Sequence, residues 1–372
     1  MKKKILFIFG TRPEAIKLAS VIKEFYNKGE RFKVLVCITS QHKEMLYPFL
    51  DFFKIKADFN LNLMKPAQSL FEITSKGLIN IESVLDKVKP DIIFVQGDTS
   101  SAFVGALAGY YKRIKVAHIE AGLRSFNKFA PFPEEMNRVL ISHIADYHFA
   151  PTLKEKKNLE KEGIKDNVYV VGNTIVDVLF YVLDIIEREN TKYNKFFKNI
   201  DFSKKVILLT VHRRENFGNS LKEICNGVRK LAKQFKNEIE IVFPVHLNPY
   251  IRKEVFKILG EESNIHLMEP LNYPYFIWLL KSAHFVLTDS GGIQEEAPYL
   301  GKPVLVIRDV TERLPTGIGK KFFRVIGRSS ENIIKESEKL IYGKWYYNNK
   351  RLNLFGDGKA SKRIGDIVEK IL

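Results

Sequence analysis

Short apolar runs alternate with longer stretches of helical period along most of this chain of 372 residues. The runs are rich in Val, Ile and Phe and show little polar alternation, which is typical of strands buried on both faces of a parallel sheet. Parallel strands need crossover connections, usually helices, so the pattern predicts an α/β protein. The expected strands span residues 5–9, 32–38, 91–95, 116–119, 168–171, 206–211, 239–245, 265–268, 285–288 and 303–307.

Two domains are expected from the length and from one interruption of this pattern. A chain this long exceeds what a single compact core usually holds. The alternation breaks near residues 187–205, where the sequence is charged and has no clean period. We therefore predict two Rossmann-like halves with a hinge somewhere in residues 171–205. The amphipathic tail, residues 359–372, could pack on either half.

The formal net charge of +17 allows two interpretations. One is a nucleic-acid-binding protein, and the other is a lysine-rich composition combined with an acidic substrate. The lysines are spread along the whole chain, with no zinc-finger or RNA-binding signature and no basic-aromatic stripe. We favour the acidic substrate, because net charge bears on steering and solubility and does not identify a fold.

Targeting and redox features are few. The N-terminal MKKKILFIFG lacks a small-residue cleavage site, so we interpret it as a first buried strand. No apolar stretch approaches the ~20 residues that span a bilayer. Cys37 and Cys225 lie in apolar or helical patterns, which indicates buried thiols, a reducing compartment and a cytoplasmic protein.

Polar and ionisable residues follow the predicted strands at the point where each strand ends. In open parallel sheets, ligands bind beyond the carboxyl ends of the strands. Each residue alone could be a helix cap or part of a surface turn, but their gathering at one predicted edge of both halves indicates a site. The candidates are Arg12, Lys17, Asp98, Glu120, His212, Arg213, His246, Ser290, Gly291 and Gly292.

Two strand-to-helix turns resemble anion pockets. Residues 290–292 (SGG) follow a predicted strand, and a helix is expected from Ile293. Backbone amides at such a turn bind anions, although glycine is common in any turn of this kind, so both interpretations stay open. The second turn is GTRP, with Pro13 at the favoured first helical position. Arg12 and Lys17 would then be anion ligands or solvated charges.

Two carboxylates at strand ends have a structural and a functional interpretation. Asp98 precedes Thr99, so it is either a helix N-cap or a site residue. Glu120 directly ends an apolar strand, which is costly without a partner. Either Lys17 or Arg124 could supply that partner, and the role of Glu120 would then be structural.

Glu134 and His212 are similarly ambiguous. Glu134 and Glu135 follow Pro133 at a predicted helix start, where the helix dipole favours acids in any case. His212 ends a strand and precedes two arginines, which indicates an acid/base group near phosphates; the alternative is a satisfied histidine. The chain has no GxGxxG after a strand, no GxxxxGK[ST], no HExxH or paired CxxC, and no GxSxG. These absences argue against dehydrogenases, P-loop enzymes, zinc hydrolases and serine hydrolases.

Several long motifs stand in order between residue 5 and residue 372. They are FGTRPEAIK, QGDTSSAF, HIEAGLRS, PFPEEMNR, VGNTIVD, VHRREN, FPVHLNP, LTDSGGIQEEAPYLGKPVLVIRDVTER and FGDGKASKRI. Together they resemble the non-hydrolysing UDP-N-acetylglucosamine 2-epimerases, and motifs of this length and number make a chance match negligible.

The resemblance implies a GT-B architecture, with two Rossmann-like domains and the active site in the cleft between them. The first domain would span residues 1–170 and 356–372, because the family's final helix crosses back to it, and would carry the acid/base residues. Residues 171–355 would form the UDP-binding domain. The resemblance also implies a homodimer without cofactor or metal, acting in polysaccharide biosynthesis, with UDP-sugars as partners rather than nucleic acid or membrane.

The implied reaction is the reversible epimerisation at C2 of UDP-N-acetylglucosamine (UDP-GlcNAc) to UDP-N-acetylmannosamine (UDP-ManNAc). The C2 hydrogen is very weakly acidic and the chain has no oxidising-cofactor motif, so the UDP leaving group on C1 is the activating feature. A carboxylate would take the C2 proton while the C1–O bond breaks, giving 2-acetamidoglucal and UDP. Returning a proton to the opposite face and re-adding UDP inverts C2, so acid/base groups must approach both faces.

The resemblance also assigns roles to individual residues. Amides of the SGG turn would take the diphosphate, and Glu296 would accept hydrogen bonds from the ribose hydroxyls. The implied catalytic residues are Lys17, Asp98, Glu120, Glu134 and His212, with no step assigned to any of them. The implied UDP-binding residues are Arg12, Arg213, Phe276, Ser290, Gly291, Gly292, Glu296 and Arg313. Many bacterial members bind a second UDP-GlcNAc as activator, at positions matching Gln41, Gln68, Glu134 and His246.

Some positions depart from the family's pattern. Gln96 stands where the family usually has His, and Glu44 stands where some activated members have Gln. Residues 314–316 read LPT where most members read PEG, in a loop that touches the nucleotide side in the family. A hydrolysing 2-epimerase, whose first motif usually lacks the PEAIK run, is one alternative. A GT-B glycosyltransferase is another, but it would not need three carboxylates and a lysine in the first domain.

Overall fold

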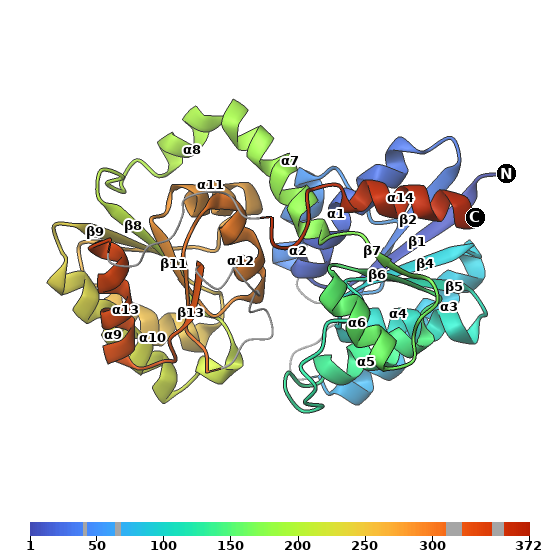
Figure 1. Cartoon of the computed structure of the whole chain (residues 1–372), viewed down its shortest axis with the longest axis horizontal. Coiled ribbons are helices and arrows are strands. Elements are labelled where there is room, and N and C mark those ends of the chain that lie inside the picture. The colour runs from blue at the N-terminus through green and yellow to red at the C-terminus, as the bar shows by residue number, and fades with distance from the viewer. Residues whose placement is uncertain (40–42, 64–67, 310–321, 344–352) are drawn as a thin grey trace. The chain divides into compact units, whose positions relative to one another are not determined.

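The computed structural model describes residues 1–39, 43–63, 68–309, 322–343 and 353–372, apart from the side chains of residues 43–45 and 214. The chain forms two compact units, Met1–Phe180 with Phe355–Leu372 and Tyr181–Leu354 (Figure 1). The first break lies inside a helix, at Phe180, rather than at the expected residue 170. That the first domain carries the acid/base residues and the second binds UDP stays a prediction.

The first unit is built on a parallel sheet of seven strands in the order β3-β2-β1-β4-β5-β6-β7. The chain runs outward from β1 to β3 and then returns to the other side of β1, so the topological switch point lies between β1 and β4. Its strands are β1 (Lys3–Phe9), β2 (Phe32–Ile38), β3 (Phe59–Asn60), β4 (Ile92–Gln96), β5 (Lys115–Ile119), β6 (Tyr147–Ala150) and β7 (Val168–Val170). Its helices are α1 (Arg12–Asn27), α2 (Lys43–Phe52), α3 (Leu70–Val88), α4 (Ser100–Tyr111), α5 (Glu134–Ile144), α6 (Leu153–Lys161), the start of α7 (Thr174–Arg188) and α14 (Ala360–Ile371).

The second unit repeats this plan with six parallel strands in the order β10-β9-β8-β11-β12-β13. Its switch point lies between β8 and β11. The strands are β8 (Lys205–Thr210), β9 (Ile239–Pro244), β10 (Ile265–Met268), β11 (Phe285–Thr288), β12 (Val304–Val306) and β13 (Phe323–Val325). The helices are the end of α7, α8 (Asn190–Phe196), α9 (Asn219–Gln234), α10 (Pro249–Leu259), α11 (Tyr273–Ser282), α12 (Gly291–Glu296) and α13 (Ser330–Ile341), with 3₁₀ turns η1 (Arg214–Asn216) and η2 (Ala297–Leu300).

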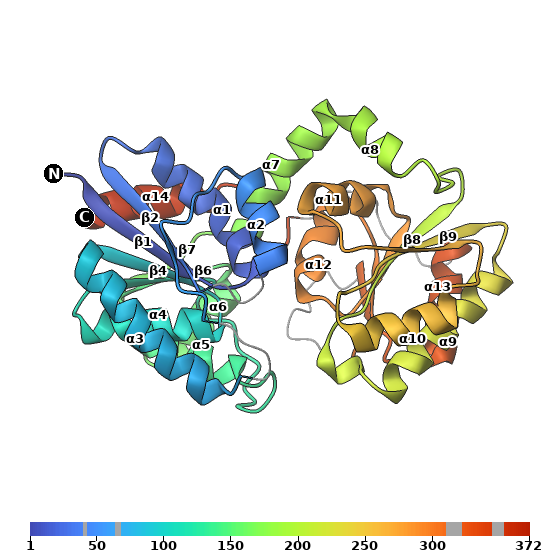
Figure 2. The ribbon, with the colours of Figure 1, turned by 180° about the vertical axis from the view of Figure 1, so that it is seen from behind.

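Each sheet is buried because helices cover both of its faces (Figure 2). Successive side chains of a strand point to opposite faces. In β1, Leu6 and Ile8 belong to the cluster with α3 and α4, whereas Phe7 stacks on Phe94 and contacts Phe25 of α1. Burying one such side chain contributes about 1.5–3 kcal/mol. Because both faces of each sheet are buried, successive residues of a strand are apolar.

The strand expectations are confirmed for all ten apolar runs, and three strands were missed. β3 has only two residues, and the short strands β6 and β13 contain His148 and Arg324, which break the apolar run. The boundary between Phe180 and Tyr181 lies within the expected hinge range of residues 171–205, and the charged stretch of residues 187–205 contains helix α8. Within the part of the chain that is described, no helix combines the length and apolarity needed to cross a bilayer.

The C-terminal helix α14 packs on the first unit, as the resemblance implied. Ile364 and Val368 are fully buried, and Gly365 lies so close to α1 that an added Cβ would approach Glu24 Cγ to 2.8 Å. Lys28 Nζ bonds to Asp366 Oδ1 at 3.0 Å and to Glu369 Oε2 at 2.9 Å. The last segment of the chain is therefore part of the first unit, although the second unit precedes it in the sequence.

Candidate functional site

The first unit gathers candidate residues where three neighbouring strands end. β1, β4 and β5 are adjacent in the sheet, and their carboxyl ends lead into the segments that carry Lys17, Asp98 and Glu120. This position beside the topological switch point is where parallel sheets bind ligands. Residues far apart in sequence thus meet because parallel pairing places these strand ends at one edge.

Glu120 is held by two donors. Lys17 Nζ lies 2.5 Å from its Oε1, and Gln96 Nε2 donates to its Oε2. The Lys17 and Glu120 side chains are 7% and 9% exposed, so the ion pair is largely shielded from water. Glu120 also has a φ of 65°, a left-handed conformation that non-glycine residues rarely adopt. Of the two partners that the sequence allowed, Lys17 is correct, because Arg124 pairs with Glu162 instead.

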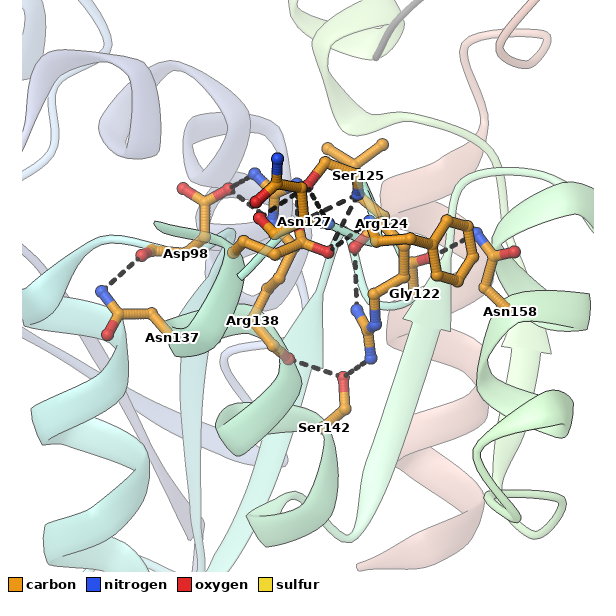
Figure 3. Close-up of polar contacts among 12 residues, drawn as sticks. Asp98, Gly122, Arg124, Ser125, Asn127, Asn137, Arg138, Ser142 and Asn158 are labelled. Carbon is orange, nitrogen blue, oxygen red and sulfur yellow. Dashed lines mark hydrogen bonds and ion pairs between the residues drawn. The ribbon is translucent and has the colours of Figure 1, made fainter. Parts of the chain in front are cut away.

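Asp98 is held by helix α5 and is not a helix cap. The N-cap of α4 is Thr99, whose hydroxyl accepts from the amide of Ala102 at 3.1 Å, so the N-cap interpretation of Asp98 is wrong. Arg138 Nε and Nη2 donate to Asp98 Oδ2, the former at 3.1 Å, and Asn137 Nδ2 donates to the Asp98 carbonyl at 2.9 Å (Figure 3). Asp98 Oδ1 has no hydrogen bond from the described residues.

Glu134 is the first residue of α5, as expected, and is partly exposed. Among the described residues its carboxylate has no hydrogen bond or ion pair. Positions 134 and 138 are four apart, so they share one face of the helix. The face that directs Arg138 to Asp98 therefore also carries Glu134.

Glu14, which was missed by sequence reasoning, links two of these loops. It is 1% exposed, its Oε2 accepts from the amides of Gly10 at 3.1 Å and Thr11 at 2.7 Å, and its Oε1 accepts from Thr99 Oγ1 at 2.6 Å. Burial raises the pKa of Glu14, more than these hydrogen bonds lower it. The TRPE sequence is a capping box, which could have identified the bonds within α1, but nothing local indicated Thr99.

The second unit places His212 and Arg213 after β8, beside the end of β11. Asp289, which is fully buried, accepts at Oδ2 from the backbone amides of His212 and Arg213, each at 2.9 Å, and from Asn216 Nδ2 at 2.8 Å. Its Oδ1 lies 3.2 Å from His212 Nδ1. This carboxylate therefore fixes the backbone of the loop and faces one nitrogen of the histidine ring. Asp289 was also missed by sequence reasoning.

The SGG turn follows β11. α12 begins at Gly291, so the expectation that the helix opens at Ile293 is wrong by two positions. The amide of Ser290 donates to Thr288 Oγ1 at 2.9 Å, whereas a Cβ added at Gly292 would have open space around it, with no atom within 4 Å. At the other end of the helix, Glu296 is 4% exposed and its Oε1 accepts from Tyr273 Oη at 2.5 Å.

The other predicted residues are distributed over both units. Arg12 is the first residue of α1, and Gln68 lies just ahead of α3. Phe276 lies on α11, and His246 follows β9 with its ring centroid 6.2 Å from that of His212. Gln41, Arg313 and the LPT loop of residues 314–316 lie outside the described residues, as does the Glu44 side chain. Within the described ranges, no group of three His, Cys, Asp or Glu side chains could hold a metal ion.

The chain is similar to known proteins over its whole length. A sequence model of a family described as UDP-N-acetylglucosamine 2-epimerase matches residues 25–369. A UDP-N-acetylglucosamine 2-epimerase from Campylobacter jejuni is 45% identical over 379 residues, which cover 100% of this chain and 98% of that protein.

Solved structures match both units. That of the UDP-GlcNAc 2-epimerase from Neisseria meningitidis bound to UDP-GlcNAc has a TM-score of 0.93 at 45% identity, covering 99% of this chain and 100% of that one. That of the UDP-GlcNAc 2-epimerase from Methanocaldococcus jannaschii in complex with UDP-GlcNAc and UDP has a TM-score of 0.86 at 36% identity, covering 99% of each chain. The similarity therefore extends to the two Rossmann-like units of a GT-B-like fold.

Proposed function

This chain belongs to the UDP-N-acetylglucosamine 2-epimerase family, and we propose that it interconverts UDP-GlcNAc and UDP-ManNAc as a non-hydrolysing isomerase. The observation that carries the proposal is the gathering of Lys17, Asp98 and Glu120 at three adjacent strand ends of the first unit. Removal and return of a proton at carbon need acid/base groups at both faces, whereas transfer of a sugar to an acceptor would not need three carboxylates and a lysine in the first unit.

The proposed reaction begins with loss of the C2 proton to a carboxylate. The C–H electron pair forms the C1–C2 double bond as the C1–O bond breaks, and UDP leaves with the electrons of that bond. Addition of UDP oxygen to C1 and of a proton to the other face of C2 then gives the epimer. The atoms balance without an oxidant, because UDP that leaves in the first half returns in the second.

The contacts in the first unit divide the carboxylates into two roles. Both oxygens of Glu120 are engaged by Lys17 and Gln96, so we assign it to orienting Lys17. Asp98 Oδ1 and the carboxylate of Glu134 have no hydrogen bond from the described residues. We propose that these two groups exchange protons with the two faces of C2.

We assign UDP to the second unit. Because the Ser290 amide already donates to Thr288, the diphosphate would draw on the amides of Gly291 and Gly292 and on the Ser290 hydroxyl. The open space at Gly292 would allow a phosphate to approach the backbone closely. Glu296, oriented by Tyr273, would accept from the ribose hydroxyls, and His212 would face the departing phosphate oxygen.

Incubation with UDP-GlcNAc in heavy water, followed by proton NMR, tests this function. We expect UDP-ManNAc with deuterium at C2, and deuterium in the recovered UDP-GlcNAc, with no accumulation of free sugar. Free N-acetylmannosamine together with released UDP would place the protein in the hydrolysing class. An unchanged substrate that still binds tightly would favour a transferase. The homodimer and the cytoplasmic location stay predictions, which sedimentation and fractionation can test.

A further inference from the structure

We infer that Arg138 is a positioning residue that aims the Asp98 carboxylate at the substrate, an inference that rests on the proposed function. Arg138 lies on α5 and is 4% exposed. Two of its nitrogens, Nε and Nη2, donate to the same oxygen of Asp98, Oδ2. This arrangement leaves Oδ1 as the oxygen that is open for proton transfer.

The guanidinium group also has a second, buried partner. Arg138 Nη1 donates to Glu135 Oε2 at 3.0 Å, and the side chain of Glu135 is 3% exposed. Glu135 in turn accepts from the amide of Ser125 at 2.9 and 3.0 Å and from that of Phe126 at 2.9 Å. The loop after β5 is thus tied through Glu135 and Arg138 to Asp98 after β4. Buried arginine suits this task because its planar fork serves two carboxylates at once.

Helix α5 holds Asp98 through its backbone as well. The side-chain amide of Asn137 donates to the Asp98 carbonyl at 2.9 Å, next to the ion pair made by Arg138 (Figure 3). The same helix starts at Glu134, on the face that carries Arg138. One rigid element therefore fixes the relative placement of the two carboxylates that we assign to proton transfer.

A purely structural ion pair is the competing explanation, and the chain provides a matched control for it. Arg124 is also 4% exposed, lies in the same unit and donates to Glu162 at 2.7 and 2.6 Å. It also donates to Ser142 Oγ at 3.0 Å, but it has no bond to Asp98 or Glu134. Loss of Arg138 leaves the buried carboxylate of Glu135 without its partner, and loss of Arg124 does the same to the partly buried carboxylate of Glu162, so both should destabilise the fold. Only loss of Arg138 should change the chemistry of folded molecules.

The experiment compares Arg138→Met, Arg138→Lys and Arg124→Met with the wild type. For each, the folded fraction, the Kd of UDP, kcat, KM and the rate of deuterium uptake at C2 of UDP-GlcNAc are measured. Per folded molecule, we expect Arg138→Met to lower kcat and deuterium uptake by about 100-fold, the scale of general acid/base catalysis. The Kd of UDP should stay within about 2-fold because the nucleotide residues are assigned to the other unit. Arg138→Lys should recover part of kcat, because the ammonium keeps the charge but cannot donate twice from a fixed plane.

The inference would be overturned by an unchanged kcat per folded molecule in Arg138→Met, or by a loss of kcat no larger than that in Arg124→Met. A loss confined to KM would also contradict it, since positioning a proton-transfer group acts on kcat. Release of free sugar by the wild type would instead count against the non-hydrolysing function, and the C2 deuterium readout would still test Arg138 in that case.

Discussion

Lys17 Nζ lies 2.5 Å from Glu120 Oε1, although the two residues are 103 positions apart in the sequence. The pair joins helix α1, which follows β1, to the end of β5, with the end of β4 between them. Because both side chains are largely buried, each compensates the charge of the other. This contact joins residues that follow different strands, and so contributes to a single candidate site at their carboxyl ends.

Breaking this pair should affect both stability and activity. We expect Lys17→Met and Glu120→Gln each to lower the free energy of unfolding by about 3–5 kcal/mol, since a buried charge is left alone. Each should also lower kcat by about 100-fold or more. The double variant should regain stability but not activity in a urea-denaturation and kinetic cycle. Equal stability of both single variants and wild type would contradict the pairing.

Asp289 should control the tautomer of His212. Asp289→Asn keeps the shape of the side chain but replaces the carboxylate oxygen that lies 3.2 Å from His212 Nδ1. An amide nitrogen there would favour the tautomer with hydrogen on Nε2, as in other aspartate–histidine pairs. We expect kcat to fall by about 10- to 100-fold, and the ¹⁵N chemical shifts of the His212 ring to show the exchanged tautomer. Unaltered ring shifts would show that Asp289 serves only the loop backbone.

Gly292→Ala should weaken nucleotide binding without destabilising the fold. The added Cβ meets no atom within 4 Å, so the Tm should stay within about 2 °C of the wild type. A methyl group would, however, occupy the space through which we expect the diphosphate to reach the backbone. Calorimetric titration should show the Kd of UDP raised about 10-fold or more. Undiminished UDP affinity would remove the SGG turn from the proposed nucleotide site.

Two buried histidines should weaken the fold in acid. Burial lowers the pKa of His118 from 6.5 to about 3 and that of His148 from 6.5 to about 4, and the two residues are paired neighbours on β5 and β6. Below pH 6.5 the unfolded chain binds protons that the folded protein does not, so stability falls as the pH drops until each folded-state pKa is reached. In that window each histidine contributes a slope of up to about 1.4 kcal/mol per pH unit.

His118→Asn tests this contribution. Urea unfolding of the wild type and the variant at pH 7 and pH 4.5 should show a smaller loss of stability on acidification in the variant. The comparison uses the difference between the two proteins, because buried carboxylates such as Glu14 titrate in both. A parallel loss in both proteins would contradict the assignment.

Much of the fold could be predicted from the sequence, because strands buried on both faces must be apolar throughout. β1 and β8 are examples in which nearly every residue is buried. β3 and β13 could not be predicted, because β3 has only two residues and Arg324 interrupts the apolar run of β13. Nothing in the local sequence indicated helix α8, because its stretch has no clean apolar period.

The site could be predicted only as a set of candidates. Position after a strand end identified Asp98 and Glu120, because that rule depends on sheet topology alone. For Glu120 the sequence left two possible partners open, since the choice between Lys17 and Arg124 depends on how α1 and α6 pack. Arg138 was not singled out, because its role depends on its hydrogen bonds to Asp98, which is 40 positions away in the sequence.

The most direct test of the central claim follows the oxygen that joins C1 to the β-phosphate. UDP-GlcNAc labelled there with ¹⁸O is incubated with the enzyme, and the position of the label is read by ³¹P NMR. If UDP leaves and returns, the label should appear in non-bridging positions of the β-phosphate in both UDP-GlcNAc and UDP-ManNAc, at a rate close to that of epimerisation. Formation of UDP-ManNAc with the label still entirely in the bridge would contradict the elimination of a UDP whose β-phosphate can rotate in the site.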